Sequence, residues 1–376
     1  MILENIELKF FRNYETQKIF FKNGINIIIG DNAQGKTNLL ESIYFLGTTK
    51  SHRLSNNEDL INKNHKISKV IGTISDNQIK TKLEIILQEK SKIIKIDNQE
   101  VNMNEYLSKL KLIIFCPDDL ELIKGSPEIR RKYLNIQISQ IYKNYIKIMS
   151  DYNKLLKTRN EYIKNMKFNL KYNKDYFEII NDYYIKKAIL IYQLRKKYID
   201  KINENIGTIY YEITHSNNIF LKYVPNIIFE NYDSKFMYET LKNKIFKNLN
   251  EEISYGKSLY GPHRDDFEFI FNNNNLKTYG SQGQQRAAIL ALKLSEIAII
   301  YKVTQLNPIL LLDDVFSEFD DTKKNNLLKY INSGLQVIIT TTNILNINKK
   351  IIEKAKIFEI KDGKIEIIKG EENGKK

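Results

Sequence analysis

Up to about residue 115, the chain alternates between short apolar runs and polar turns. Runs of this kind predict β-strands over residues 25–29, 68–74, 81–87 and 91–97. Residues 1–11 alternate polar and apolar side chains, as an edge strand would. After Lys36 the period becomes that of a helix, with one apolar face formed by Leu39, Leu40, Ile43 and Leu46. We therefore expect mixed α and β structure in this part.

The middle of the chain has a helical pattern instead. A predicted strand at residues 112–115 ends at Pro117, and Pro127 stands near the start of a long helical region. From residue 128 to about residue 201 glycine and proline are almost absent, and apolar residues recur at every third or fourth position. This pattern predicts several helices packed as an arm. The stretch 207–257 is ambiguous.

The mixed pattern returns in the last third. It predicts a strand at residues 265–271, a helix from residue 286 to about 301, and buried parallel strands at 308–314 and 335–342. Residues 370–376 form a polar tail that we expect to be disordered. The sequence thus predicts an α/β core that is split by an insertion. The expected domains are residues 1–116 and 257–376 for the two halves of the core, and residues 117–256 for the inserted helical lobe.

Composition excludes some classes of protein. With 376 residues, 42% of them hydrophobic, the chain can bury a sizeable core. No apolar run approaches the ~20 residues needed to cross a bilayer, and no membrane partner is expected. One cysteine and four histidines argue against a disulfide framework and against an ordinary Cys/His zinc site. We expect a soluble, cytoplasmic protein.

The net charge of +14 is concentrated in one segment. Residues 127–202 contain 18 Lys and Arg against 7 Asp and Glu, a net charge of +11, and 11 of the 24 tyrosines. Basic side chains interleaved with aromatic ones suit contact with a phosphate backbone and stacking of bases. A solvated helical face, with tyrosines packed between helices, would have the same composition. The candidate DNA contacts are Arg130, Arg131 and Lys132.

A phosphate-binding loop is the strongest functional motif. The pattern G-x-x-x-x-G-K-[ST] occupies residues 30–37, between a predicted strand and a predicted helix. Backbone N–H groups of such a loop face the phosphates of a nucleotide. Lys36 would reach the β- and γ-phosphates, and the Thr37 hydroxyl would bind Mg²⁺. The candidate nucleotide-binding residues are Gly30, Asp31, Asn32, Ala33, Gln34, Gly35, Lys36, Thr37 and Asn38.

The run "PILLLDDVFSEFD" matches a Walker B element, which is an apolar strand that ends in two carboxylates. Asp313 would hold Mg²⁺, directly or through water. Asp314 would orient or deprotonate the attacking water. A buried strand followed by an acidic turn is the alternative interpretation, and the phosphate loop earlier in the chain argues against it.

A third motif, "GSQGQQR" at residues 280–286, stands before an amphipathic helix. It resembles the signature of ATP-binding-cassette (ABC) ATPases, in which a Ser hydroxyl and a Gly N–H meet the γ-phosphate held by the other subunit. The candidates here are Ser281, Gly283 and Gln284, and Ser281 stands 32 residues before Asp313. "SEFD" at residues 317–320 resembles the D-loop of the same enzymes. A polar loop that merely caps a helix is the alternative.

The chain closely resembles the RecF family of bacterial recombination-repair ATPases, which is related to SMC proteins. Besides the motifs above, the resemblance is carried by "FFRNY" (10–14), "KSHR" (50–53), "FCPDDLELIKGSPEIRRKYLN" (115–135) and "GPHRDDF" (261–267). The chain has Lys50 where an Arg is common, Asp118 where Glu is frequent and Phe319 where Leu is common. None of these departures removes a group expected to touch phosphate or metal.

The resemblance implies an ABC-type P-loop ATPase core, a mixed sheet flanked by helices, with an inserted helical lobe. It implies a dimer closed around two ATP molecules with Mg²⁺, in which Lys36, Asp313, Asp314 and the other subunit's Ser281 act in a slow, DNA-stimulated hydrolysis. The implied partners are DNA at single-strand gaps and junctions and the RecO and RecR mediators of recombinase loading. A part in the SOS response is also implied.

Other classes of protein fit the sequence less well. An ABC transporter subunit, the main alternative, would have an "LSGGQ"-like signature and a histidine after the last core strand, where this chain has Thr340, Thr341 and Thr342. A GTPase would need an N-K-x-D motif, and an SMC protein proper would need long heptad tracts. The roles of His52, Arg53, His263 and Arg264 stay open between nucleotide, DNA, a dimer partner and a simple turn.

Overall fold

The computed structural model describes residues 1–53, 56–76, 79–89, 91–168, 170–317, 323–324, 326–327, 329, 334–361 and 363–370. The chain divides into two compact units. The first, called the core unit, contains residues 1–120, 208–217 and 286–376, and the second, called the arm unit, contains residues 121–207 and 218–285.

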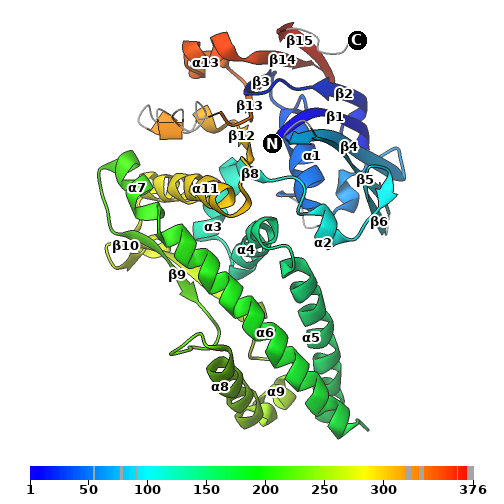
Figure 1. Ribbon diagram of the computed structural model, residues 1–376, viewed down its shortest axis with the longest axis vertical. Coiled ribbons are helices and arrows are strands. Elements are labelled where there is room, and N and C mark those ends of the chain that lie inside the picture. Colours follow the sequence, from blue (N-terminus) through cyan, green and yellow to red (C-terminus); the bar gives the residue numbers. More distant parts are fainter. Residues whose placement is uncertain are drawn as a thin grey trace. The chain divides into compact units, whose positions relative to one another are not determined.

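A six-stranded, mostly parallel sheet forms one layer of the core unit, in the order β15-β14-β3-β13-β12-β8 (Figure 1). Its strands are β3 (Ile25–Ile29), β8 (Leu112–Phe115), β12 (Ile309–Asp313), β13 (Val337–Thr341), β14 (Lys356–Lys361) and β15 (Lys364–Lys369). β8, β12, β13, β3 and β14 are parallel, and β15 is antiparallel. Strands β12 and β13 are buried on both faces, which explains their unbroken apolar sequences and confirms the prediction of buried parallel strands.

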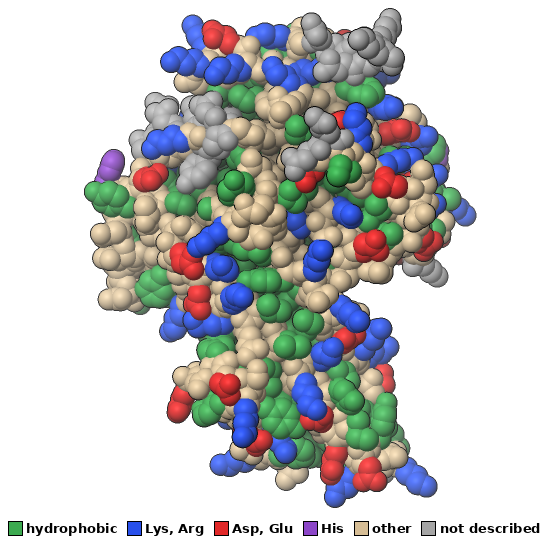
Figure 2. Space-filling view, in the orientation of Figure 1, with side chains coloured by type: hydrophobic (Ala, Val, Ile, Leu, Met, Phe, Trp, Pro, Cys, Tyr) green, Lys and Arg blue, Asp and Glu red, His purple; other side chains and the backbone are tan. Residues whose placement is uncertain are grey.

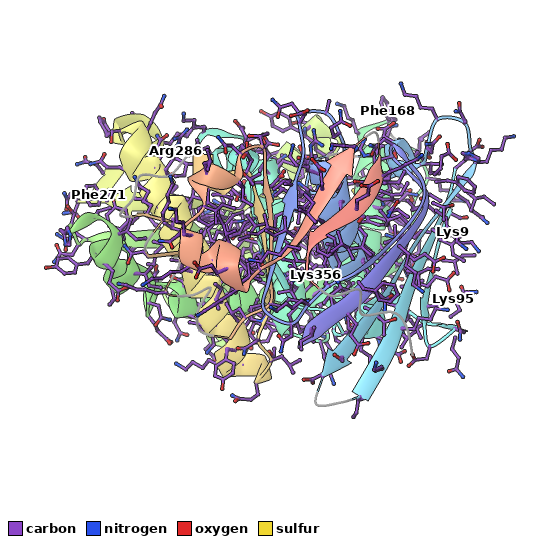
Figure 3. The ribbon with its side chains drawn as sticks, turned by 90° about the horizontal axis from the view of Figure 1, so that it is seen from above. Lys9, Lys95, Phe168, Phe271, Arg286 and Lys356 are labelled. Atoms are coloured by element: carbon purple, nitrogen blue, oxygen red, sulfur yellow. The ribbon has the colours of Figure 1, made fainter. Side chains whose placement is uncertain are left out.

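A second six-stranded sheet is antiparallel, in the order β2-β1-β4-β5-β6-β7. It contains β1 (Ile2–Phe11), β2 (Tyr14–Phe20), β4 (Ile67–Asp76), β5 (Ile79–Gln88), β6 (Ser91–Ile96) and β7 (Gln99–Glu100). The expectation that residues 1–11 form an edge strand is wrong, because β1 pairs with β2 on one side and with β4 on the other. Lys9 and Lys95 point outward from this sheet in Figure 3. The alternation of polar and apolar side chains along β1 therefore reflects one buried face and one solvent-exposed face.

Helix α1 (Lys36–Thr48) packs against strands of both sheets (Figure 1). Eleven of its residues are buried, including polar ones, so burial extends beyond the single apolar face predicted for it to nearly the whole helix. Two glycines permit this close packing. A Cβ on Gly72 of β4 would run into Leu46, and a Cβ on Gly47 would run into Leu112 of β8. The helix that follows the phosphate loop is therefore fixed between the two layers.

The other elements that the structure describes in the core unit are short, apart from one long helix. They are η1 (Glu58–Leu60), α2 (Met103–Tyr106), η2 (Pro117–Leu120), η4 (Val315–Ser317), η5 (Ile344–Asn346), α13 (Lys349–Lys354) and α11 (Gln282–Thr304). Helix α11 begins four residues earlier than expected and passes from the arm unit into the core unit. No described helix is long and apolar enough to cross a membrane.

The arm unit is built on two long helices, α5 (Tyr145–Lys167) and α6 (Lys174–Asn203), which pack side by side (Figure 1). The other helical elements are α3 (Glu121–Lys124), α4 (Pro127–Ile141), α7 (Ile206–Thr214, shared with the core unit), α8 (Ser234–Lys247), α9 (Leu249–Tyr255), η3 (Pro262–Arg264) and α10 (Leu276–Tyr279). A small antiparallel sheet joins β9 (Ile219–Val224), β10 (Asp266–Phe271) and β11 (Asn274–Asn275).

The division into units differs from the domains expected from the sequence. Residues 257–285, expected in the ATPase core, belong to the arm unit, and residues 208–217 belong to the core unit. The reason is long-range pairing. β10 pairs with β9 along six residues, and Asp265 accepts hydrogen bonds from Arg195 of α6 and from the Tyr223 hydroxyl of β9. The chain therefore returns to the core only at residue 286.

Gly47→Ala should destabilise the protein although alanine favours helix formation. The new methyl would lie 3.0 Å from Leu112 Cγ and 3.2 Å from Leu110 Cγ, between buried side chains that have little room to move. We expect a loss of about 1–3 kcal/mol, measured by thermal or denaturant unfolding. The control is Gly207→Ala, where the nearest atom is Ile219 O at 3.7 Å. Equal stability of the two variants would contradict the proposed packing constraint.

Candidate functional site

The phosphate loop connects β3 to α1. Gly30 has φ 158° and Gly35 has φ 114°. A Cβ on Gly30 would lie 2.6 Å from Ile360 O, so both sterics and backbone conformation require glycine. The Lys36 ammonium donates to Gly30 O and Asp31 O, each at 2.7 Å, which places it inside the curve of the loop. Burial lowers the Lys36 pKa, and the nearby carboxylates of Asp314, Asp313 and Asp31 act in the opposite direction.

The "FFRNY" segment, residues 10–14, supports this loop through hydrogen bonds. The Tyr14 hydroxyl donates to Gly35 O at 2.9 Å, and Asn13 Nδ2 donates to Gln34 O at 3.3 Å. Asn38 Nδ2 donates in turn to Asn13 Oδ1 at 2.9 Å. A Cβ on Gly35 would lie 2.6 Å from Asn13 Nδ2 and 2.9 Å from the Tyr14 hydroxyl. The second glycine of the loop is therefore set by contact with the amino-terminal strands.

A buried carboxylate joins the amino-terminal segment to "KSHR". Glu41 of α1, fully buried, accepts from Arg12 Nε at 2.9 Å and from the Ser51 hydroxyl at 2.5 Å. Ser51 Oγ also accepts from the backbone N–H of Arg53 at 3.0 Å. Because Glu41 holds both Arg12 and Ser51, and Ser51 in turn holds the Arg53 N–H, the turn that carries Arg53 is tied to the helix of the phosphate loop.

Asp313 lies at the carboxyl end of β12, beside the other groups expected to act on a nucleotide. Its Oδ1 accepts from the Thr37 hydroxyl at 3.1 Å and from the Thr340 hydroxyl at 2.6 Å. These residues follow or end three adjacent parallel strands, β3, β13 and β12. The carboxyl ends of parallel strands are the usual site of ligand binding in such sheets.

The surroundings of Asp313 suit a divalent cation. Burial raises its pKa, while the hydrogen bonds from Thr340 and Thr37 and the charge of Arg53 act in the opposite direction. One carboxylate and one hydroxyl match the few protein ligands that Mg²⁺ takes when phosphates and water fill its other positions. Among the described residues, no group of three or more His, Cys, Asp and Glu is placed to hold a metal ion.

Asp314 has φ 51°, in the left-handed region, and its N–H lies 3.2 Å from Thr340 O and from Thr340 Oγ1. Aspartate tolerates this conformation better than most residues, but it still stores strain. The conformation turns the second carboxylate away from the direction in which the strand would continue. The rest of the expected D-loop, residues 318–320, lies outside the described residues.

The expected signature loop belongs to the arm unit and opens α11. Ser281 N donates to Gln284 Oε1 at 2.9 Å, and Gln284 N donates to Ser281 Oγ at 3.3 Å, which is a reciprocal capping box. A Cβ on Gly283 would meet only Ser281 Oγ, at 4.0 Å. No described contact within the chain therefore requires glycine here, and the exposed helix N-terminus is open to close approach.

The three candidate DNA contacts differ in exposure. Arg130 is 6% exposed and makes a two-pronged pair with Asp266, at 2.6 and 2.8 Å, so its predicted role as a DNA contact does not fit. Arg131 is half-buried and donates to Asp265 O at 2.9 Å. Lys132 is exposed. Arg130 thus joins α4 to β10, and the Asp266 carboxylate offsets the cost of removing the charged guanidinium from water.

In "GPHR", the first and third residues are structural. Gly261, with φ 154°, leaves no room for a Cβ beside the hydroxyls of Tyr184 and Tyr152. His263 lies 2.7 Å from the Tyr152 hydroxyl through Nδ1 and 3.3 Å from Ser258 O through Nε2. Burial lowers the His263 pKa to about 4, so the ring is neutral at pH 7. Arg264 is exposed.

Two comparisons of sequence bear on this site. The profile described as "RecF/RecN/SMC N terminal domain" matches residues 2–366. The "DNA replication and repair protein RecF" of Macrococcus caseolyticus is 38% identical over 97% of this chain and 99% of its own length. The protein of the same name from Staphylococcus carnosus is 37% identical over 97% of this chain. The chain belongs to the RecF family.

Solved structures agree with this assignment. The recombination mediator protein RecF in its ATP form, described as part of the RecFOR pathway, has a TM-score of 0.90 and 34% identity over 98% of this chain and 97% of that chain. An SMC head bound to a domain of ScpA has a TM-score of 0.53 at 17% identity, which supports the fold alone. The ABC-type ATPase core expected from the sequence is therefore confirmed.

The sequence analysis missed the residues that hold the motifs in place. From sequence, Thr340 matters only because a transporter ATPase would have a histidine near this position. In the structure its hydroxyl orients Asp313. Glu41 gave no signal, since a glutamate within a helix is ordinarily exposed. The reason for its burial becomes recognisable only once the partners Arg12 and Ser51 are known.

Thr340→Val should weaken the site, because it removes the donor that orients Asp313 while keeping the side-chain shape. By analogy with other residues that support metal ligands, we expect a loss of about 10- to 100-fold in Mg²⁺-dependent nucleotide affinity or hydrolysis. Thr340→Ser keeps the hydroxyl and should retain most activity. If valine and serine behaved alike, the hydroxyl would have no part in the site.

His263 should make stability depend on pH. Its folded pKa of about 4 lies below the unfolded value of 6.5, so between these values the unfolded chain binds more protons. The contribution of His263 to the free energy of unfolding is fully present above pH 6.5 and is lost as pH falls through about 4, by about 3 kcal/mol in total. Urea unfolding at several pH values should show a shallower slope for His263→Gln. Parallel curves for the two proteins would show that the ring is not buried neutral.

Proposed function

We propose that this chain is an ATP-dependent DNA-binding protein of recombinational repair and replication, acting as RecF does. The observation that carries the proposal is the buried Asp313 carboxylate shared by Thr37 of the phosphate loop and Thr340. Similarity over nearly the whole chain to relatives named as DNA replication and repair proteins adds the biological context.

The residues around Asp313 fit Mg²⁺ and ATP. Backbone N–H groups of residues 30–38 and the Lys36 ammonium would hold the phosphates, and Thr37 and Asp313 would hold Mg²⁺. Bound Mg²⁺ would neutralise charge on the β- and γ-phosphates during hydrolysis. Asp314 would orient the attacking water, and Arg53, whose charge acts on Asp313, would face the terminal phosphate. Because the second carboxylate is an aspartate, we expect slow ATP hydrolysis. Hydrolysis would then act as a switch that opens the dimer.

A homodimer would complete each site. Ser281 and Gly283 lie at the exposed N-terminus of a 23-residue helix, where N–H groups and the helix dipole favour an anion. The absence of any described contact that requires glycine at residue 283 supports close approach by another molecule. Each ATP would then be bound by one subunit's Lys36 and met by the other subunit's Ser281.

DNA at gaps and junctions is the proposed ligand of the closed dimer. The RecFOR pathway, in which a relative of known structure is placed, suggests RecO and RecR as partners in recombinase loading, with a part in SOS induction and a cytoplasmic location. An ABC transporter subunit remains the alternative. The full-length similarity to RecF relatives and the arm unit of residues 121–207 and 218–285 both disfavour it.

Mixing two inactive variants tests the shared site. Lys36→Met and Ser281→Arg should each abolish hydrolysis, because each variant spoils both sites of its own homodimer. An equal mixture should regain about a quarter of wild-type activity, since half of the dimers would be mixed and each would have one intact site. If mixed dimers form and remain inactive, Ser281 does not act on the partner's nucleotide.

DNA binding with and without ATP tests the function itself. We expect tighter binding to gapped than to fully duplex DNA in the presence of Mg²⁺ and ATP, and weaker binding for Lys36→Met.

Lys132→Gln combined with Arg131→Gln should reduce the slope of log affinity against log salt by up to about 2. Arg130→Gln should instead lower stability, because it leaves Asp266 without its partner. Absence of DNA binding under all conditions would contradict the proposal.

A further inference from the structure

Two neighbouring hollows in the arm unit share one lysine. The first, about 390 Å³, is lined by Tyr255, Tyr260, Glu251, Asn226 and Arg264. The second, about 420 Å³, is lined by residues of α5 that include Lys157, Lys164 and Glu161. Lys257 lines both hollows. Both hollows include residues of the loop 256–264, and we call the two together the Lys257 groove.

Positive charge is in excess around this groove. Lys157, Lys164, Lys257 and Arg264 are exposed, against Glu161 and Glu251. Two further lysines lie close by. The Lys167 side chain approaches Gly256, and Lys244 Nζ lies 5.4 Å from the centre of the Tyr260 ring. Figure 2 shows basic and acidic side chains intermixed on one face of the protein. The excess of cations at the groove follows from its lining residues.

The lysines of α5 form a row. Lys147, Lys154, Lys157 and Lys164 are exposed and recur at helical spacing along one face. At 1.5 Å per residue, the row is about 25 Å long, which would span several phosphates of an extended strand. Among the described residues, no ion pair takes up these four lysines, although the Asp151 carboxylate lies near Lys147 and Lys154. The row leads into the Lys257 groove at Lys157 and Lys164.

The groove also offers aromatic surface. The Tyr255 side chain is 60% exposed at the end of α9, and the Tyr260 hydroxyl donates to Glu251 at 3.1 Å. An exposed ring beside lysines is suited to stacking of an unpaired base, whereas duplex DNA keeps its bases stacked inside. Phosphate contacts and base stacking together favour a single strand over a duplex.

The floor of the groove is rigid because buried hydrogen bonds hold its loop. Arg159, fully buried, pairs with Glu252 at 2.5 Å and donates to the Ser258 hydroxyl at 2.6 Å. Asn160 accepts from Ser258 N, and the Tyr184 hydroxyl donates to Tyr260 O. A loop fixed in this way needs little ordering when a ligand binds.

We propose that the Lys257 groove binds single-stranded nucleic acid, with phosphates on Lys157, Lys164, Lys257 and Arg264 and a base stacked on Tyr255. This assignment rests on the proposed DNA-binding function. It adds that the bound nucleic acid is single-stranded and that the Lys257 groove is the surface that binds it. The proposed DNA contact at this groove is distinct from the one predicted at residues 130–132. In that segment Arg130 is occupied by its pair with Asp266. The strand that is exposed at a gap would be held here.

The test uses the full-length protein with Mg²⁺ and ATP and a labelled oligo(dT) of about 20 nucleotides, compared with a blunt duplex. The triple variant Lys157→Gln, Lys164→Gln, Lys257→Gln should lose at least about tenfold in affinity for oligo(dT), with the salt slope reduced by about 2. Tyr255→Ala should lose about fivefold or more, and Tyr255→Phe should not. The matched control is Lys222→Gln with Lys235→Gln, two exposed lysines elsewhere in the arm unit.

Basal hydrolysis without DNA should be unchanged in all these variants. Photocrosslinking of an iodouracil-containing strand should modify Tyr255 or Tyr260. If the wild-type protein binds oligo(dT) and the triple variant binds it equally well, the groove assignment is overturned while the proposed function stands. Equal losses for duplex and strand, with no effect of Tyr255→Ala, would overturn the assignment to a single strand. A wild-type protein that binds neither DNA would instead contradict the proposed function.

Discussion

The position of one buried carboxylate depends on the whole core unit. Asp313 is 6% exposed, and burial of a carboxylate is costly unless hydrogen bonds replace its water. Those bonds come from Thr37 after β3 and from Thr340 on β13, so the strand order β3-β13-β12 has to be formed first. A shift of β13 by one residue would turn Thr340 to the other face of the sheet. The same parallel pairing that builds the core therefore assembles the nucleotide site.

Buried ion pairs play the corresponding part in the arm unit. Arg159 pairs with Glu252 and Arg195 pairs with Asp265, and all four side chains are at most 1% exposed. Such pairs contribute little net stability, because the cost of removing both charges from water offsets most of their attraction. Breaking one, however, leaves an isolated buried charge, so alternative packings are disfavoured. Through Ser258 and Pro262, the two arginines thereby hold the loop of residues 256–264 in place.

The parts of the structure that the sequence predicted are local. The phosphate loop, the apolar strand before Asp313 and the helical pattern of the arm depend on neighbouring residues, and each lies where expected. The errors concern partners that are distant in the chain. Whether β1 is an edge strand depends on β4, and whether Arg130 faces solvent depends on Asp266, 136 residues later. Neither a hydrophobic period nor a charge count contains that information.

The signature loop shows how a structural and a functional interpretation can both hold. Ser281 and Gln284 cap α11 reciprocally, as expected of a loop whose only task is to start a helix. Yet Ser281 Oγ only accepts in that pair, so its own proton is still available to a phosphate oxygen. Capping also fixes the hydroxyl at the helix N-terminus before any ligand arrives, which reduces the entropy lost on binding. Gly283 contributes nothing to the cap, and its missing side chain matters only if something else approaches. If the loop meets a phosphate, as proposed above, the cap prepares it for that contact. The glycine, rather than the serine, is the residue that capping alone does not explain.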